Sequence, residues 1–208
     1  MKNPQIISVK TVKIILGFLG ISLPFILIFD SIILCHEPIR DSISAYYYSN
    51  FGDVFVGILI AMATFLFSYQ GYQDDKDNLI TNIAAVAAIL VALFPTDGLE
   101  ITCIKCITMP DYITGKIHFI SAFIFFVSLS ILSYVYFRKS DLKIIGMEKK
   151  KRNFIYLICS ITMICCILVI GIQILVLKQK NIFIPESIAL FAFGLSWLTK
   201  AELIFKDK

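Results

Sequence analysis

Six long apolar runs constrain this chain more than any other feature of its sequence. An α-helix needs about twenty apolar residues to span about 30 Å of hydrocarbon, and most of the runs are close to that length. A helix also satisfies its own backbone hydrogen bonds, which a spanning segment must do in lipid. The runs therefore predict six membrane-spanning helices, at residues 12–34, 53–72, 79–94, 117–137, 154–177 and 184–205.

The composition leaves little chain to fold in water. Of the 208 residues, 58% are hydrophobic and 16% are charged, whereas a soluble domain is roughly half apolar and a quarter charged. Outside the runs, no polar segment is much longer than about twenty residues, which is too short for a domain. We therefore expect one all-α integral membrane domain over residues 1–208, a polytopic six-transmembrane-helix bundle.

The positive charge sets the predicted orientation. Short loops rich in Lys and Arg stay on the cytoplasmic side, and the loop 138–152 holds seven basic residues against two acidic ones. With that loop inside, both termini are cytoplasmic, although Lys178 and Lys180 fall outside. The first run is too long for a signal peptide, and no Ala-x-Ala site follows it. The positive-inside pattern and the absence of a targeting extension favour a bacterial inner (plasma) membrane over an organelle.

Small residues predict where helices pack closely. Gly57 and Ala61 share one face of the second predicted helix, and the third carries alanines at 84, 88 and 92. Such spacing lets helix backbones approach in lipid, although alanine is also simply common in membrane helices.

Polar residues from several helices gather on the predicted outer side, which makes this rim the candidate site. Ionisable groups near membrane depth are costly unless they are paired or solvated, so a cluster of them indicates function. The catalytic candidates are His118, Asp53, Asp97, Ser44 and Ser42, and the ligand-binding candidates are Tyr46, Tyr47, Tyr48, Arg40 and Glu186.

Each of these candidates has both a chemical and a structural explanation. His118 would act as a general base oriented by Asp97 or Asp53, with Ser42 or Ser44 as the nucleophile. A histidine at a helix start also commonly bonds a neighbouring helix or a loop carbonyl, and Asp53 suits a helix cap. The three tyrosines fit an aromatic belt, or a loop that folds back over the bundle mouth and presents hydroxyl groups to a lipid headgroup.

The outer cysteines allow two further readings. Cys103 and Cys106 form a C-x-x-C pair that would oxidise to a disulfide in an oxidising compartment or remain as free thiols. Together with Cys35, His36 and His118 they could instead ligate zinc. A single C-x-x-C without a second spaced pair is weak evidence for metal, so we expect no metal and no cofactor.

Four ordered segments, Ser42–Tyr48, Asp53–Gly57, Ala92–Thr96 and His118–Phe126, resemble a poorly characterised group of bacterial six-helix membrane proteins. More distantly, the layout is similar to the damage-regulated autophagy modulator family, whose members carry an Ile-Ser element after helix one and a His near the start of helix four. The resemblance covers nearly the whole chain and implies a multi-pass protein without agreed catalytic residues. It marks Ser44, Asp53 and His118 as positions of interest.

These observations favour a non-enzymatic membrane protein that binds a membrane lipid or a membrane partner, with homo-oligomerisation left open. The alternative is an intramembrane hydrolase or transferase that acts on a lipid at the outer rim. A small transporter is a weaker alternative, because no broken-helix repeat is evident. Charge placed at helix ends, without a basic face interleaved with aromatics, excludes nucleic acid as a partner.

Overall fold

The computed structural model describes residues 8–69, 76–96, 111–140 and 145–206, and all regular structure in these ranges is helical. This confirms the predicted all-α class. Three π-helical turns extend helices, and one 3₁₀ helix lies in a loop: η1 (Asp30–Leu34), η3 (Leu132–Tyr136), η4 (Ile172–Val176) and the 3₁₀ helix η2 (Ser44–Tyr48). The six main helices are α1 (Val9–Phe29), α2 (Gly52–Phe67), α3 (Asp77–Leu93), α4 (Asp111–Ile131), α5 (Met147–Gly171) and α6 (Phe183–Lys200).

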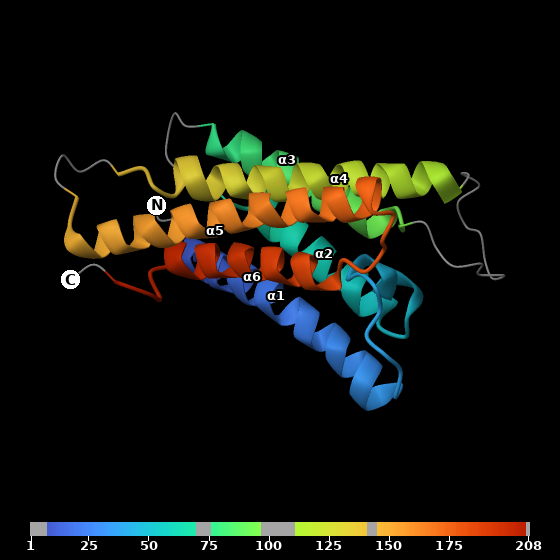
Figure 1. Ribbon diagram of the computed structural model, residues 1–208. Coiled ribbons are helices and arrows are strands. Elements are labelled where there is room, and N and C mark those ends of the chain that lie inside the picture. The colour runs from blue at the N-terminus through green and yellow to red at the C-terminus, as the bar shows by residue number, and fades with distance from the viewer. Residues whose placement is uncertain (1–7, 70–75, 97–110, 141–144, 207–208) are drawn as a thin grey trace.

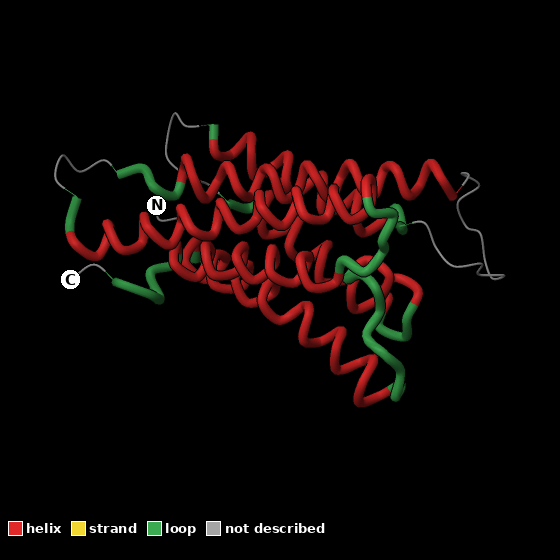
Figure 2. Tube along the Cα trace, viewed as in Figure 1, coloured by secondary structure: helices red, strands yellow, loops and turns green. Residues whose placement is uncertain are grey.

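The helices form one bundle in which α1, α3 and α5 run in one direction and α2, α4 and α6 run in the other (Figure 1). The start of α1 and the end of α6 therefore lie at the same end of the bundle. The described loop segments lie mostly at the two ends of the bundle (Figure 2). This up-and-down order is the topology that six alternating crossings would require.

Several helices begin or end at residues other than the ends of the predicted apolar runs. Helix α4 begins at Asp111 and α5 at Met147, each more than one turn before its run, while α2 ends at Phe67 and α6 ends at Lys200. Backbone hydrogen bonding continues through polar residues, as in the basic first turns of α5, so an apolar run marks the part that suits lipid and not the helix ends.

Three helical stretches are both long enough and apolar enough to cross a membrane, Val9–Leu34, Ile113–Tyr136 and Met147–Val176. Helices α2 and α3 are apolar but shorter. The described residues thus support three spans by length and composition, and the prediction of six spans goes further than this.

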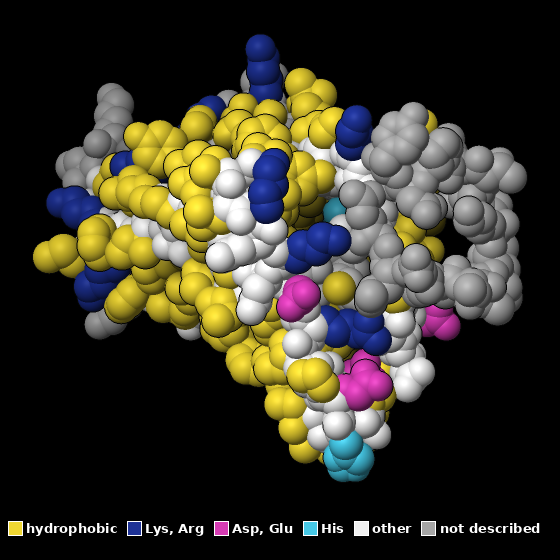
Figure 3. All heavy atoms as spheres, turned by 45° about the vertical axis from the view of Figure 1, so that its right-hand side comes forward, with side chains coloured by type: hydrophobic (Ala, Val, Ile, Leu, Met, Phe, Trp, Pro, Cys, Tyr) yellow, Lys and Arg dark blue, Asp and Glu magenta, His cyan; other side chains and the backbone are white. Residues whose placement is uncertain are grey.

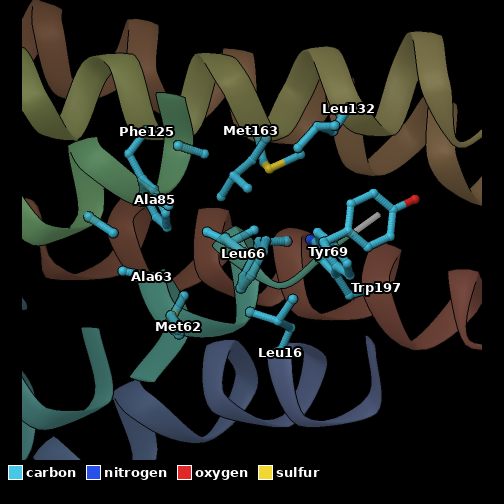
Figure 4. Packing of buried hydrophobic residues seen from close by; sticks show 14 of the residues in the cluster. Leu16, Met62, Ala63, Leu66, Tyr69, Ala85, Phe125, Leu132, Met163 and Trp197 are labelled. Carbon is cyan, nitrogen blue, oxygen red and sulfur yellow. The ribbon is translucent and has the colours of Figure 1, made fainter. Parts of the chain in front are cut away.

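The centre of the bundle is a cluster of buried side chains from all six helices (Figure 4). Trp197 of α6 is 1% exposed and packs edge-on against Tyr69 and Phe137, with ring centroids 5.1 Å away in both cases. Edge-to-face aromatic pairs add roughly 0.5–1.5 kcal/mol to the free energy of burial. Helix α6 packs mainly against α1 and α5, whereas α3 packs against α2 and α4.

Helices α1 and α6 approach closely through glycine. A Cβ added at Gly194 would lie 2.5 Å from the carbonyl oxygen of Gly17, and one added at Gly17 would lie 2.5 Å from Leu198 Cδ2. The predicted alanines of α3 are buried as well, with Ala84 and Ala88 at 0% exposure. The prediction for Gly57 was wrong, because a Cβ there would meet nothing within 4 Å.

Candidate functional site

The loop between α1 and α2 folds back against the start of α6 and carries Ser44 with it. The Asp41 carbonyl oxygen accepts hydrogen bonds from the backbone N–H groups of Ile182 (2.7 Å) and Phe183 (2.8 Å). These N–H groups lie at the start of a helix, where they have no partner within the helix. The Ile43 N–H then donates to Glu186 Oε2 at 2.6 Å. Three hydrogen bonds therefore hold this loop at the mouth of the bundle.

Ser44 and His118 are in direct contact. His118 Nε2 lies 2.8 Å from Ser44 Oγ, and its other ring nitrogen, Nδ1, lies 2.7 Å from the carbonyl oxygen of Phe94. Both side chains are largely buried, with Ser44 at 9% exposure and His118 at 5%. The two residues are 74 positions apart in the chain, and only the folded loop brings them together.

The hydrogen bonds determine which nitrogen carries the proton in a neutral ring. A backbone carbonyl oxygen only accepts, so Nδ1–H donates to Phe94. Nε2 is then the acceptor, and the Ser44 hydroxyl donates to it. This is the tautomer that a general base beside a serine requires, with the carbonyl of Phe94 in the orienting position.

Glu186 contacts the same hydroxyl from α6. Its carboxyl group hydrogen-bonds the Ser44 side chain in addition to accepting from the Ile43 N–H. Ser44, His118 and Glu186 thus form a polar cluster built from the loop, α4 and α6. The single hydroxyl proton of Ser44 can be donated to only one neighbour at a time, His118 or Glu186.

The polar cluster lies in the wall of a cleft of about 410 Å³, here called the main cleft. This volume is within the range of about 300–1,000 Å³ that is usual for ligand sites. The other walls are apolar, and they come mainly from α4, α5 and η4. The contributing side chains include Phe119, Phe123, Phe126, Leu168, Leu175 and Val176.

A second hollow of about 510 Å³, the charged recess, adjoins the main cleft and shares part of its lining, including Ser42, Thr96 and Phe119. The charged recess also contains Asp41, Lys116 and Lys180. In Figure 3 this end of the bundle comes forward, and Lys and Arg side chains lie there next to Asp and Glu side chains, beside a mostly hydrophobic flank.

The remaining predicted catalytic residues lie elsewhere or outside the described ranges. Asp53 is exposed in the first turn of α2 and does not line the main cleft. Ser42 does line it, but its hydroxyl accepts the backbone N–H of Ala45 at 3.0 Å. Asp97 lies outside the described residues, as do Cys103 and Cys106 with their predicted disulfide.

The three tyrosines occupy different environments. Tyr46 is fully buried, with its hydroxyl 2.7 Å from Ser31 Oγ, so it reaches neither an interface nor a ligand. Tyr47 packs edge-on against Tyr48. The Tyr48 hydroxyl donates to the carbonyl of Thr96, and its side chain lines the charged recess.

Arg40 lies over the Tyr46 ring at 5.9 Å and borders a small polar pocket of about 100 Å³ next to Asp30. Cys35 donates a hydrogen bond to Asp30 and accepts one from Asn50. Among the described residues, no three His, Cys, Asp or Glu side chains form a group that could hold a metal ion, so Cys35, His36 and His118 do not combine in that way.

The sequence allowed a backbone carbonyl as the partner of His118 but could not identify it as that of Phe94, because a carbonyl leaves no signature in residue type. It did not indicate Glu186 as a partner of Ser44. This second contact had a signal, because Glu186 follows Pro185 in the first turn of an apolar helix, where a carboxylate is costly unless it is paired.

No curated protein and no solved structure matches the chain. The resemblance to the damage-regulated autophagy modulators therefore stays a prediction. One family profile matches residues 22–201, which include every described residue of the polar cluster and of the main cleft. The chain belongs to DUF7103, a family of unknown function.

Proposed function

We propose that this chain is an integral membrane protein that crosses the bilayer six times and binds a lipid with its acyl chain in the main cleft. The observation that carries the proposal is the cleft itself, whose lining is mostly apolar and whose ionisable side chains, His118 and Glu186, both belong to the polar cluster. The loop 138–152 contains seven basic residues, which is typical of a cytoplasmic loop. We keep the bacterial inner membrane as the proposed location.

Exposed apolar side chains on the shorter helices support six crossings. Helix α6 carries such side chains at Ile184, Ile188, Phe191 and Leu195, and α3 carries them at Leu79, Ile83, Val86 and Leu93. This spacing of three and four residues is one helix face, which a soluble bundle would bury. At 1.5 Å per residue these helices are about 26–27 Å long, and local thinning of a bilayer accommodates that length.

The rim of the main cleft favours a lipid over a water-soluble ligand. Phe123, Leu168 and Val176 line the cleft and are also 52%, 61% and 70% exposed on the flank of the bundle. The cleft therefore opens between α4 and α5 onto the surface that would face acyl chains. An acyl chain can enter from the side without crossing water.

The charged recess favours an anionic phospholipid. Among the described residues that line it, Lys116 and Lys180 supply two cations and Asp41 supplies one carboxylate. A phosphate headgroup in this recess would lie next to an acyl chain in the main cleft, because the two hollows share lining residues. Cations near the interface attract anionic lipid by about 1 kcal/mol each.

Single cysteines in a cysteine-free background test the six crossings. We expect Lys76→Cys and Lys206→Cys to be protected from an impermeant maleimide in intact cells and to react after the membrane is opened. If only the three long stretches crossed, both positions would be outside. Reaction of both cysteines in intact cells would therefore refute six crossings, and Asn50→Cys serves as the outer control.

Replacement of Lys116 and Lys180 by glutamine tests whether the charged recess binds an anionic headgroup. In nanodiscs, we expect the Lys116→Gln/Lys180→Gln variant to bind a fluorescent phosphatidylglycerol about ten-fold or more weakly than the wild type, at roughly 1 kcal/mol per charge. Binding of the matching phosphatidylcholine should change little. Lys150→Gln, which removes a charge from the start of α5, is the control. Equal losses for both lipids would contradict an anionic headgroup site.

A further inference from the structure

We propose that Ser44 and His118 are a nucleophile and its general base, and that they cleave the acyl ester of the lipid held in the main cleft. This inference rests on the proposed lipid site and gives that site an activity. It follows from the position of the pair, which lies in hydrogen-bond contact and faces the same cleft as the apolar walls.

The geometry satisfies the requirements of a serine–histidine pair. The Ser44 Oγ to His118 Nε2 distance of 2.8 Å is within the hydrogen-bond reach that a general base needs. The bond from Nδ1–H to the Phe94 carbonyl fixes the ring and leaves Nε2 as the acceptor. Ser44 stands at the first residue of η2, and the loop that carries it is anchored to α6 by Glu186.

Ser42 provides the internal comparison. It lines the same cleft two residues away, but its hydroxyl accepts the N–H of Ala45 within its own loop, which is a local capping bond. The Ser44 hydroxyl instead reaches side chains on two other helices. The two serines of the cleft therefore differ in their partners, and only the Ser44 hydroxyl contacts a group that can act as a base.

The reaction balances with water as the only co-reactant. Ser44 Oγ attacks the ester carbonyl carbon while its proton passes to His118 Nε2. The bond from that carbon to the lipid alcohol oxygen then breaks, and Nε2 returns the proton to the leaving oxygen. Water attacks the acyl-Ser44 ester in the same way, its proton passes through Nε2 to Ser44 Oγ, and a free fatty acid leaves. The charged recess gives water a polar approach to this cluster.

A long-chain alkyl fluorophosphonate tests the pair directly in the full-length protein in nanodiscs. We expect the wild-type chain to carry the adduct on Ser44, mapped by peptide mass spectrometry, which requires no variant. Ser187→Ala, at a serine that lies outside both hollows and donates to the carbonyl of Phe183, should keep the adduct, and Ser44→Ala should lose it. His118→Gln should slow both the labelling and the release of fatty acid from phosphatidylglycerol by about 100-fold or more, the usual contribution of a general base.

Bound phospholipid is measured in the same samples, so that the two proposals fail separately. If the wild-type chain retains phospholipid but carries no adduct on Ser44 and releases no fatty acid, the catalytic inference is overturned and the lipid site stands. An adduct that persists in Ser44→Ala also overturns it. If the chain retains no phospholipid, the proposed lipid site itself fails.

Discussion

At the scale of single residues, Tyr46 makes a buried hydrogen bond whose energetic value can be measured. Its hydroxyl bonds Ser31 Oγ in a fully buried position. Tyr46→Phe leaves Ser31 without this partner, so we expect a loss of about 1–3 kcal/mol of stability. The measurement is the thermal midpoint of the purified protein in a fixed detergent.

Tyr47→Phe is the matched control for this bond. Tyr47 is only partly buried, and its described contact is the edge-on ring packing with Tyr48, which the variant keeps. Its thermal midpoint should therefore stay within experimental error of the wild type. Equal shifts for the two variants would show that the bond to Ser31 contributes nothing.

Cys35 carries a testable pH dependence. Burial, followed by the hydrogen bond that the thiol donates to Asp30, raises the pKa of Cys35 above its ordinary value. A raised pKa lowers the thiolate fraction at any pH below it, and the thiolate is the reactive form. With the other five cysteines replaced, alkylation should be slower than that of a model thiol at pH 8 and accelerate as the pH rises. Asp30→Asn should speed the reaction at pH 8, and an unchanged rate would contradict the assigned cause.

Residue type and spacing could identify Ser44 and His118 as candidates but could not pair them. The contact depends on how the loop after α1 folds onto α6, which the carbonyl of Asp41 and the carboxylate of Glu186 determine. Tyr46 illustrates the opposite error. A tyrosine in a polar loop next to an apolar run fits an interfacial belt equally well, and only the fold shows that it is buried.

At the scale of helices, the α1–α6 contact should be the least tolerant of added volume. A Cβ at Gly194 would meet the Gly17 carbonyl oxygen at 2.5 Å, and a backbone atom cannot move aside as the end of a side chain can. We expect Gly194→Val to cost about 1–3 kcal/mol or more, as overpacking does. Gly57→Val is the control, because the space around that position is open.

The thermal midpoint of both glycine variants decides this prediction. We expect the thermal midpoint to fall for Gly194→Val alone. Equal midpoints for the two variants would mean that α1 and α6 can move apart without loss of stability. The spacing of small residues predicted close helix packing at Gly57 and not at Gly194, because spacing describes only the residues of one helix. The close approach depends on which faces meet, and spacing within one helix does not contain that information.

At the scale of the whole molecule, the number of helices was predictable and the number of crossings was less so. The six apolar runs correspond to six helices among the described residues. An apolar run that is long enough to span a bilayer is also long enough to form a stable helix. Helices α2, α3 and α6 fall outside the three long stretches, so the crossing of α3 and α6 depends on their exposed apolar faces and that of α2 on the alternating order of the bundle. Neither property can be read from one run alone.

The main cleft was not predictable from the sequence. Its walls are ordinary membrane-helix side chains of α4 and α5, and nothing in their order distinguishes a side chain that lines a cleft from one that faces lipid. Gly171 is one such residue. It lines the cleft, and a Cβ added there would meet nothing within 4 Å. The Cβ of a larger residue therefore fits at this position without displacing a neighbour.

Native mass spectrometry of phospholipid retained after gentle detergent extraction tests the lipid cleft most directly. The comparison is between the wild type, Gly171→Trp, and Gly57→Trp, which places the same side chain in open space outside the cleft. We expect the wild type and Gly57→Trp to retain one anionic phospholipid per chain and Gly171→Trp to lose most of it, with thermal midpoints unchanged. Equal phospholipid retention by all three proteins would contradict the proposed site.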